Sequence, residues 1–384
     1  MSTHAQPFRL ACQSSVNTPG PIIFSPTSSL TATAITLIIT LAVMLFLSAP
    51  VFAQHYQQTN LVSDIPGLAA VHDPNLVNPW GLSRSGGSPW WVADNGTGLS
   101  TLYNGLGQPF PLASPLVVTI PVPPGGVPPS TPTGTVFVGG LGFGGGAAFA
   151  FVTEDGTLSA WSGGTAAVLK KNNAGSAIYK GLAVGEINGA NFLYAANFFA
   201  GTIDIFDKDY VPVNLAPGAF SDPKIPKGFA PFNVQNIGGK IFVAFAKQDE
   251  DKKDEVAGAG LGFVDEFDSS GNLLLRLKSG HWMNAPWGLV LASPNFGKLS
   301  NRLLVGQFGS GEIASFDPVN GNFHGLLRGL HGQPLAIEGL WALSFGNGGN
   351  AGSVDTLFFT AGIDDEEHGL FGTITPVKGD DDDD

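Results

Sequence analysis

The stretch NPWGLSRSGGSPWWVADNGTGLSTLYNGLGQP (residues 78–109) decides the fold of this chain. An apolar segment runs on from a glycine, and a turn leads to a second apolar segment that ends at Asp94. A polar turn then leads to a third segment that ends at Tyr103, and a weaker fourth segment follows. The same order recurs at residues 179–212 and 285–321. Short apolar runs bounded by Gly, Pro, Asn and Asp predict β-strands, so the repeating unit contains four strands.

Three more degenerate copies fill the gaps between these repeats. The residue before the first-strand glycine, or its equivalent, is in chain order Trp80, Thr133, Lys180, Phe232, Trp287 and Trp341. Successive spacings are 53, 47, 52, 55 and 54 residues. A period near 50 with four strands in each unit is typical of a β-propeller. The sequence therefore predicts an all-β fold, a single six-bladed propeller with four antiparallel strands in each blade.

The two ends of the repeat region predict how the ring closes. The last copy ends near Pro376 after its third strand, so its outer strand is missing from the C-terminal end. The segment QTNLVSDIPGL (58–68) can supply that strand from the N-terminal end and cover the exposed edge. We therefore expect one propeller over residues 54–378 and no second domain. We expect a monomer.

Composition narrows the classes of partner. The chain has 384 residues, of which 18 are Lys or Arg and 31 are Asp or Glu, for a formal net charge of −13. Nucleic acid is excluded as an expected partner, because phosphate binding needs a basic surface. The acidic runs at 249–255 and 380–384 are interpreted as solvated surface, with residues 379–384 as a disordered tail.

An apolar segment near the N-terminus predicts export. Residues 35–47 read ITLIITLAVMLFL and are followed by SAPVFA, which carries small residues before a cleavage point after Ala53. This order is typical of a signal peptide over residues 1–53. We expect a secreted or periplasmic protein with no membrane contact after cleavage; retention of the segment as an anchor is the alternative.

Several long phrases carry a family resemblance. The repeats at 78–109 and 285–321 resemble NHL-type repeats, and the chain resembles an uncharacterised family of exported bacterial propellers through phrases such as NAPWGL and FTAGIDDEEHGLFG. More distantly it is similar to the calcium-dependent, gluconolactonase-like propellers. Glu338 in EGLW matches a ligand position of that pattern, whereas Trp80 and Trp287 stand where it has Asn. The resemblance implies a fold and an extracytoplasmic location, and it argues against a simple transfer of the lactonase site.

Inner-strand starts should line one mouth of the central channel. Aromatic rings there either pack between the blades as core or form the walls of a ligand site, in which a few polar groups would orient the ligand. On the second interpretation the ligand-binding residues are Trp80, Lys180, Phe232, Trp287 and Trp341.

A second set of positions, at the ends of the second strands, should reach the same face. These positions are Asp94, Glu154, Asn197, Ala246, Gln307 and Ala361. The acidic run Asp364–Glu367, followed by His368, is the turn that continues from the last of them. Ca²⁺ prefers such carboxylate and amide oxygens, whereas His368 suits zinc or proton transfer. A solvated loop is the alternative. If a metal is bound, the expected ligands are Asp94, Asn197, Glu338, Asp364 and Asp365.

Three functional hypotheses follow from these patterns. The leading hypothesis is a propeller that binds a small molecule, a carbohydrate or a protein partner at the channel mouth, with Ca²⁺ as the one cofactor considered. The rival is a Ca²⁺-dependent hydrolase, lactonase or lyase that uses the carboxylates at the mouth. The third is a structural surface protein whose channel is filled by side chains. The sequence contains no G-x-S-x-G, H-E-x-x-H or P-loop motif.

Overall fold

The fold is known from a computed structural model that describes residue 20 and residues 55–377. Within residues 55–377 the chain forms 25 β-strands, one short 3₁₀ turn, η1 (Gly297–Leu299), and no α-helix. In this described part, no helix has the length and apolar character needed to cross a bilayer. Apart from Gly20, the predicted signal peptide with its cleavage point after Ala53 lies outside the described residues, as does the predicted tail at 379–384.

Five blades follow one another along the chain, each built from four consecutive antiparallel strands. The first contains β3 (Pro79–Ser83), β4 (Trp90–Asp94), β5 (Leu99–Tyr103) and β6 (Val117–Thr119). The second contains β7 (Pro132–Phe137), β8 (Phe149–Thr153), β9 (Thr157–Trp161) and β10 (Val168–Asn172). The third contains β11 (Tyr179–Ile187), β12 (Ala190–Asn197), β13 (Thr202–Phe206) and β14 (Pro212–Val213). The fourth contains β15 (Phe229–Ile237), β16 (Lys240–Lys247), β17 (Gly262–Phe267) and β18 (Leu273–Arg276). The fifth contains β19 (Pro286–Leu291), β20 (Leu303–Gln307), β21 (Ile313–Phe316) and β22 (Phe323–Leu326).

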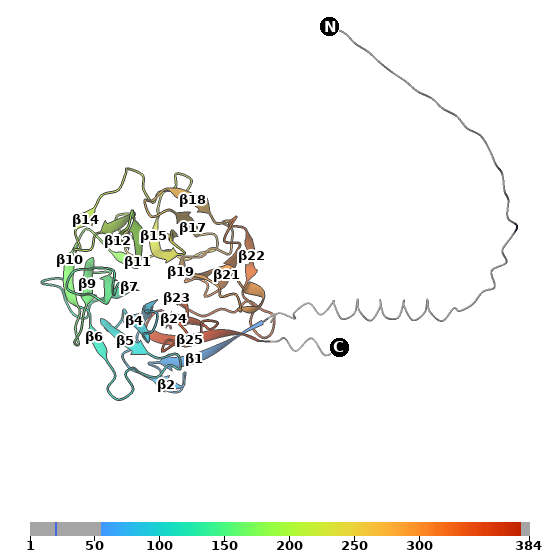
Figure 1. The fold of residues 1–384 in the computed structure, drawn as a ribbon, viewed down its shortest axis with the longest axis horizontal. Helices are drawn as coiled ribbons and strands as arrows, with labels where there is room; N and C mark the ends of the chain where they lie inside the picture. The colour runs from blue at the N-terminus through green and yellow to red at the C-terminus, as the bar shows by residue number, and fades with distance from the viewer. Residues whose placement is uncertain (1–19, 21–54, 378–384) are drawn as a thin grey trace, which may run out of the picture. The chain divides into compact units, whose positions relative to one another are not determined.

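The sixth blade joins the two ends of the described chain. Its first three strands are β23 (Leu340–Phe345), β24 (Leu357–Ile363) and β25 (His368–Val377), and its outer strand is β1 (His55–Ser63). Strand β1 pairs antiparallel with β25, from His55 opposite Val377 to Ser63 opposite Leu370 (Figure 1). A two-residue strand, β2 (Val71–His72), adds to its edge in parallel. The predicted N-terminal closure is confirmed, although the closing strand lies at 55–63 and not at 58–68.

The first strands of the blades form a closed inner ring. Each contacts the first strand of the next blade, and β23 contacts β3 to complete the circle. In Figure 1 the labels β7, β11, β15, β19 and β23 lie near the centre, whereas β10, β14, β18 and β22 lie toward the rim. The predicted all-β, six-bladed propeller is confirmed.

Alternating side chains hold neighbouring blades together. On β12, Leu193 packs into the core shared with the second blade, and the next residue, Tyr194, packs into the core shared with the fourth. On β16, Val243 faces the third blade and Phe242 the fifth. Successive strand residues point to opposite faces, so each sheet buries both of its faces against neighbours.

The PWG sequence brings inner strands close together. A Cβ on Gly81 would lie 2.3 Å from the carbonyl oxygen of Thr133 in the second blade. A Cβ on Gly288 would lie 2.6 Å from the carbonyl oxygen of Trp341 in the sixth. Only glycine permits backbones to approach this closely. The tryptophan before each glycine is therefore held at the start of an inner strand, beside the axis of the ring.

Candidate binding site at the channel mouth

The aromatic residues at the inner-strand starts pack against one another. We call Trp80, Phe232, Trp287 and Trp341 the aromatic plug; their exposed fractions are 0–4%. The rings of Trp80 and Trp341 stack with centroids 3.5 Å apart, and Trp287 meets both rings edge-on at 6.2 and 5.8 Å. Phe232 lies 5.8 Å from Trp341. The four rings thus form one contiguous apolar cluster at the axis. Their predicted role in ligand binding stays a prediction, and it would require a ligand to reach rings that are buried here.

Lys180 places one cation beside the plug. Its ammonium lies 2.6 Å from Glu154 Oε1 and 3.2 Å from Asp254 Oδ1, and the side chain is 1% exposed. It also lies 5.0 Å from the centroid of the Trp80 ring. Burial lowers the pKa of Lys180, but Glu154, Glu255 and Asp254 outweigh it and raise the pKa above its usual value. The buried ammonium is therefore held charged by surrounding carboxylates.

Two asparagines donate hydrogen bonds to carboxylates near Lys180, one to Glu154 and one to Glu366. Asn95 Nδ2 donates to Glu154 Oε2 at 2.9 Å, and Asn78 Nδ2 donates to Glu366 Oε2 at 2.7 Å. Asn78 Oδ1 in turn accepts a hydrogen bond from Trp341 Nε1 at 3.0 Å. The side-chain amide of Asn78 therefore joins the plug to a carboxylate on the acidic turn.

The carboxylates of this cluster repel one another's charge. Burial raises the pKa of Glu255 to about 8; Lys180 lowers it, and Glu366 and Asp254 raise it. Burial also raises the pKa of Glu366, with Glu154 and Asp254 acting in the same direction against Asn78 and Lys180. Groups of like charge in a partly desolvated site disfavour their own ionisation. One ammonium is thus shared among four acidic side chains.

A cavity of about 600 Å³, which we call the acidic pocket, lies beside this cluster. Four carboxylate residues contribute to its walls: Glu255, Glu338, Asp365 and Glu366. Its apolar wall includes Phe308, whose ring stacks on Trp341 of the plug with centroids 4.1 Å apart. The remaining lining is small: Ala257, Gly309, Ser310, Gly311, Ala336, Gly339 and Gly362.

The acidic turn has an unusual backbone. Asp364, Asp365 and Glu366 have φ values of 53°, 53° and 67°, in the left-handed region that costs non-glycine residues about 1–3 kcal/mol each. The turn connects β24 to β25 through the pair Ile363 and His368. Such an arrangement persists only where the surrounding structure enforces it, and here it places two successive carboxylate residues on the pocket wall.

The structure places the predicted acidic residues in two groups. Asp365 and Glu338 both line the acidic pocket, whereas Asp364 does not. Glu366, which the sequence did not favour over its neighbours, lines it as well. His368 lies on the other side of the turn, where its Nδ1 is 2.7 Å from Asp64 Oδ2.

Asp94 is the last residue of β4, and Asn197 is the last residue of β12. Each forms a hydrogen bond to the next strand of its own hairpin. Asp94 is fully buried, its Oδ2 accepts from Thr101 N at 2.9 Å, and burial raises its pKa well above the usual value. Asn197 Nδ2 donates to Asp204 Oδ2 at 3.0 Å. Neither residue lines the acidic pocket. In the part of the chain that the structure describes, no group of three or more His, Cys, Asp or Glu has the arrangement of a metal site. The predicted Ca²⁺ site stays a prediction.

Sequence reasoning missed the contribution of the run 249–255. It was interpreted as solvated surface, and Asp254 is indeed exposed, but Asp254 also pairs with Lys180, and the half-buried Glu255 lines the pocket. A signal was present, because this loop follows the second strand of the fourth blade just as the acidic turn follows that of the sixth.

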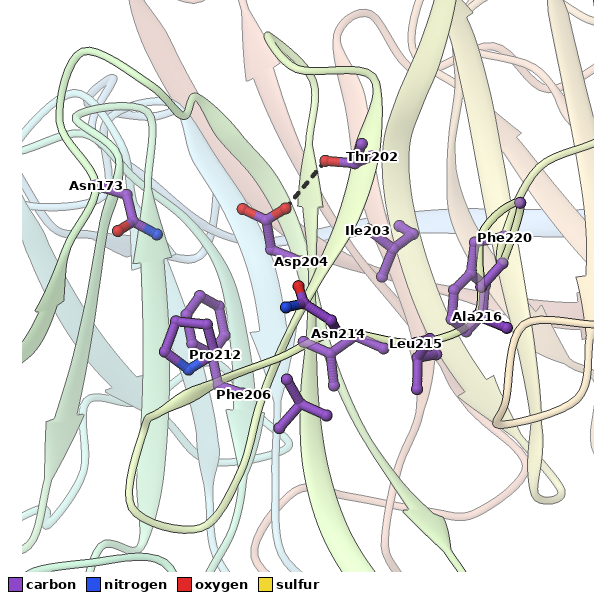
Figure 2. Close-up of a pocket in the computed structure, with 14 residues that line it drawn as sticks. Asn173, Thr202, Ile203, Asp204, Phe206, Pro212, Asn214, Leu215, Ala216 and Phe220 are labelled. Atoms are coloured by element: carbon purple, nitrogen blue, oxygen red, sulfur yellow. Dashed lines mark hydrogen bonds between the residues drawn. The ribbon is translucent and has the colours of Figure 1, made fainter.

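A smaller cavity of about 280 Å³ lies between the outer strands of the third blade and the loop that follows (Figure 2). Its one acidic side chain, Asp204, already accepts hydrogen bonds from Thr202, Tyr179 and Asn197. Most of the other lining residues are apolar, as Figure 2 shows for Phe206, Pro212 and others. The acidic pocket therefore holds the richer set of polar groups.

Comparison with known proteins places the chain among viral relatives. Uncharacterized protein R648 of Acanthamoeba polyphaga mimivirus is 31% identical over 333 residues, which cover 82% of this chain and 78% of R648. Uncharacterized protein L690 of the same virus is 30% identical over 331 residues, which cover 82% of this chain and 84% of L690. These relatives do not bear on the predicted bacterial origin, export or NHL relationship.

No family model matches the chain. Among solved structures, a streptogramin B lyase covers 84% of this chain and 97% of its own, with 12% identity and a TM-score of 0.49. A catalytically inactive virginiamycin B lyase from Staphylococcus aureus, solved with quinupristin, covers 84% and 99%, with 10% identity and a TM-score of 0.46. The sequence relatives are the basis of the assignment: the chain belongs to the same family as mimivirus proteins R648 and L690.

Proposed function

We propose that this protein is an exported binding propeller whose ligand is a small organic cation held in the acidic pocket. The observation that carries the proposal is the lining of that pocket, in which Glu255, Glu338, Asp365 and Glu366 surround one cavity of about 600 Å³. Small-molecule sites are usually concave, with an apolar wall and a few convergent polar groups, and their volumes are roughly 300–1,000 Å³. Export is proposed on the apolar segment at 35–47 and the small residues before position 54.

The charge of the pocket selects the ligand class. Lys180 already pairs with Glu154 and Asp254, neither of which lines the pocket. Its positive charge is therefore already compensated by carboxylates other than the four that line the pocket. Burial is the main cause of the raised pKa of Glu255 and Glu366, and a ligand ammonium would favour their charged forms and offset the added repulsion from neighbouring carboxylates. The net charge of −13 would also attract cations toward the site.

Phe308 gives the pocket a place for the apolar part of the ligand. Its ring lines the cavity and is backed by Trp341, which holds it in position. Aromatic faces attract both apolar groups and ammonium ions. A small amine with an aliphatic or aromatic body fits this combination better than a neutral sugar does.

A divalent cation is a second candidate for the same pocket, and it would support the hydrolase hypothesis. The observation in its favour is that Glu338, Asp365 and Glu366 all line the same pocket, and Ca²⁺ takes 6–8 oxygen ligands. Their side chains are not grouped as a metal site in the described residues, so an ion would have to draw them together. The predicted ligand set would then be reduced to those members that line the pocket, with Glu366 added.

A thermal-shift panel separates these candidates. Primary amines of graded size, the matching alcohols, and Ca²⁺ with and without chelator are tested on the same protein at equal ionic strength. We expect amines to raise Tm and the alcohols to have no effect, because binding to the folded state adds stability. A rise with Ca²⁺ alone would favour the metal site, and identical curves under all conditions would reject both.

A further inference from the structure

A second charged cavity lies at the seam where the propeller closes. This cavity, which we call the basic pocket, has a volume of about 420 Å³. It lies between β1 of the sixth blade and the loop and outer strand of the fifth. The residues that line it are His55, Tyr56, Lys298, Leu299, Arg302, His324, Leu326, Leu327 and Arg328.

The basic pocket is lined by basic side chains, whereas the chain as a whole is acidic. It gathers Lys298, Arg302 and Arg328, three of only 18 basic residues in a protein with 31 acidic ones. Asp317 is the one carboxylate partner recorded for these cations within residues 55–377, at 3.2 Å from Arg302 Nη1. His324 Nε2 lies 4.0 Å from the same carboxylate. Positive charge therefore exceeds negative charge at this point of the surface.

Two of the cations are free to meet a ligand. Neither Lys298 nor Arg328 forms a salt bridge with any residue that the structure describes. Arg328 uses Nη1 to donate to the carbonyl oxygen of Gly332 at 2.5 Å, which fixes its side chain. His55 has a buried Nδ1 with no hydrogen-bond partner among the described residues. Buried polar atoms are normally paired, so an unpaired one beside a cavity is a signal of a missing partner.

Rigid backbone contacts hold the two sides of this pocket together. Tyr56 N donates to the carbonyl oxygen of Arg328 at 2.9 Å. Tyr56 Oη donates to the carbonyl oxygen of Phe296 at 2.8 Å and accepts from Leu299 N at 3.1 Å. The cationic side chains are thus presented from elements that are fixed relative to one another, as a specific site requires.

We propose that the basic pocket binds an oxyanion, with Lys298 and Arg328 as its main partners and His55 contributing from β1. Guanidinium and ammonium groups suit phosphate and carboxylate oxygens, and charge-assisted hydrogen bonds of this kind are among the strongest in proteins. A volume of about 420 Å³ leaves room for a small phosphorylated molecule whose body contacts Leu326 and Leu327. This site is independent of the function proposed for the acidic pocket.

The same chemistry could come from the chain itself. His55, which lines the pocket, pairs with Val377 at the end of β25, and the run Asp380–Asp384 begins three residues later in the sequence. Its carboxylates are a second candidate source of anionic oxygens, which the experiment below separates from a free phosphate. In either case the anion joins β1 to the fifth blade and stabilises the closure of the ring.

The test measures Tm and phosphate affinity for the full chain, using inorganic phosphate and phenyl phosphate against chloride at equal ionic strength. We expect both phosphates to raise Tm. Lys298→Gln with Arg328→Gln should weaken phosphate binding by roughly tenfold or more, since it removes two charge-assisted partners of the anion. Lys224→Gln with Lys227→Gln removes the same charge from an exposed loop and should leave the affinity unchanged.

Further variants separate the two sources and guard against misfolding. Lys298→Gln alone changes an exposed side chain and should still reduce affinity if the double variant unfolds. Deletion of Asp380–Asp384 should leave phosphate binding unchanged if the ligand is free, and should strengthen it if the run occupies the pocket. The proposal is overturned if neither the full nor the shortened chain responds to phosphate. It is equally overturned if the Lys298 variants and the Lys224 control respond alike.

Discussion

At the scale of single residues, Lys180 connects the aromatic plug to the carboxylates of Glu154 and Asp254. The side chain is 1% exposed, yet its ammonium contacts Glu154 and Asp254, and Trp287 Nε1 donates to its backbone carbonyl at 3.0 Å. Removing one partner of a buried ion pair is costly, because the other charge is left without compensation. The residue therefore affects both the stability of the plug and the charge of the mouth.

Replacing Lys180 with methionine tests this role. Lys180→Met should lower the free energy of unfolding by about 3–5 kcal/mol, because Glu154, only 14% exposed, loses its cation. Adding Glu154→Gln should restore part of the loss. Urea denaturation of the two variants and the wild type measures both effects. A single variant as stable as the wild type would mean that the ion pair contributes nothing to the fold.

Glu255 predicts a pH dependence of stability. Its pKa in the folded protein is about 8, above the usual 4.5, so the folded state binds more protons than the unfolded state between these values. Stability should therefore fall as the pH rises from about 5 to about 8. Glu255→Gln should flatten this slope, and urea unfolding at a series of pH values compares the two. Parallel slopes would show that Glu255 ionises normally.

At the scale of elements, β1 carries the closure of the ring. It completes the sixth blade through its pairing with β25 and buries Tyr56 and Val62, which are 1% and 0% exposed. Without it, β25 would present an open edge and two inter-blade cores would lose a wall. The strand also supplies two residues of the basic pocket.

Removal of β1 should affect the whole propeller. We expect deletion of residues 55–63 to lower Tm by roughly 5 °C or more, since several kcal/mol of buried apolar contact is lost and each kcal/mol is worth about 1–2 °C at this size. Tyr56→Phe is the matched milder change and should cost only about 1–3 kcal/mol, because it removes one hydroxyl from its two partners. Calorimetry that finds an unchanged Tm in the deletion variant would reject closure by β1.

At the scale of the whole molecule, the repeat was readable from the sequence and the site was readable only in part. The PWGL phrases and the 47–55-residue spacing predicted six blades, because the strand pattern is local and recurs. Glu338 and Asp365, two of the predicted metal ligands, both flank strands of the sixth blade and both line the acidic pocket. Asp254 as a partner of Lys180 and Glu255 as a lining residue were missed, because they lie on the long loop between β16 and β17, whose direction no periodicity reports. Asp94 does not line the acidic pocket, since a polar residue at a strand end can also be buried inside its own hairpin.

The central claim is that carboxylates on the wall of the acidic pocket hold a cationic ligand. The most direct measurement is the affinity of the best amine, by titration calorimetry, for two charge-matched double variants. All four residues are exposed, but Glu338→Gln with Asp365→Asn changes residues that line the pocket, whereas Asp364→Asn with Glu367→Gln changes residues of the acidic turn that do not line it. We predict a loss of roughly tenfold or more for the first variant and little change for the second, because only the first pair lines the pocket and can contact the ligand. Equal affinities in the two variants would contradict the account.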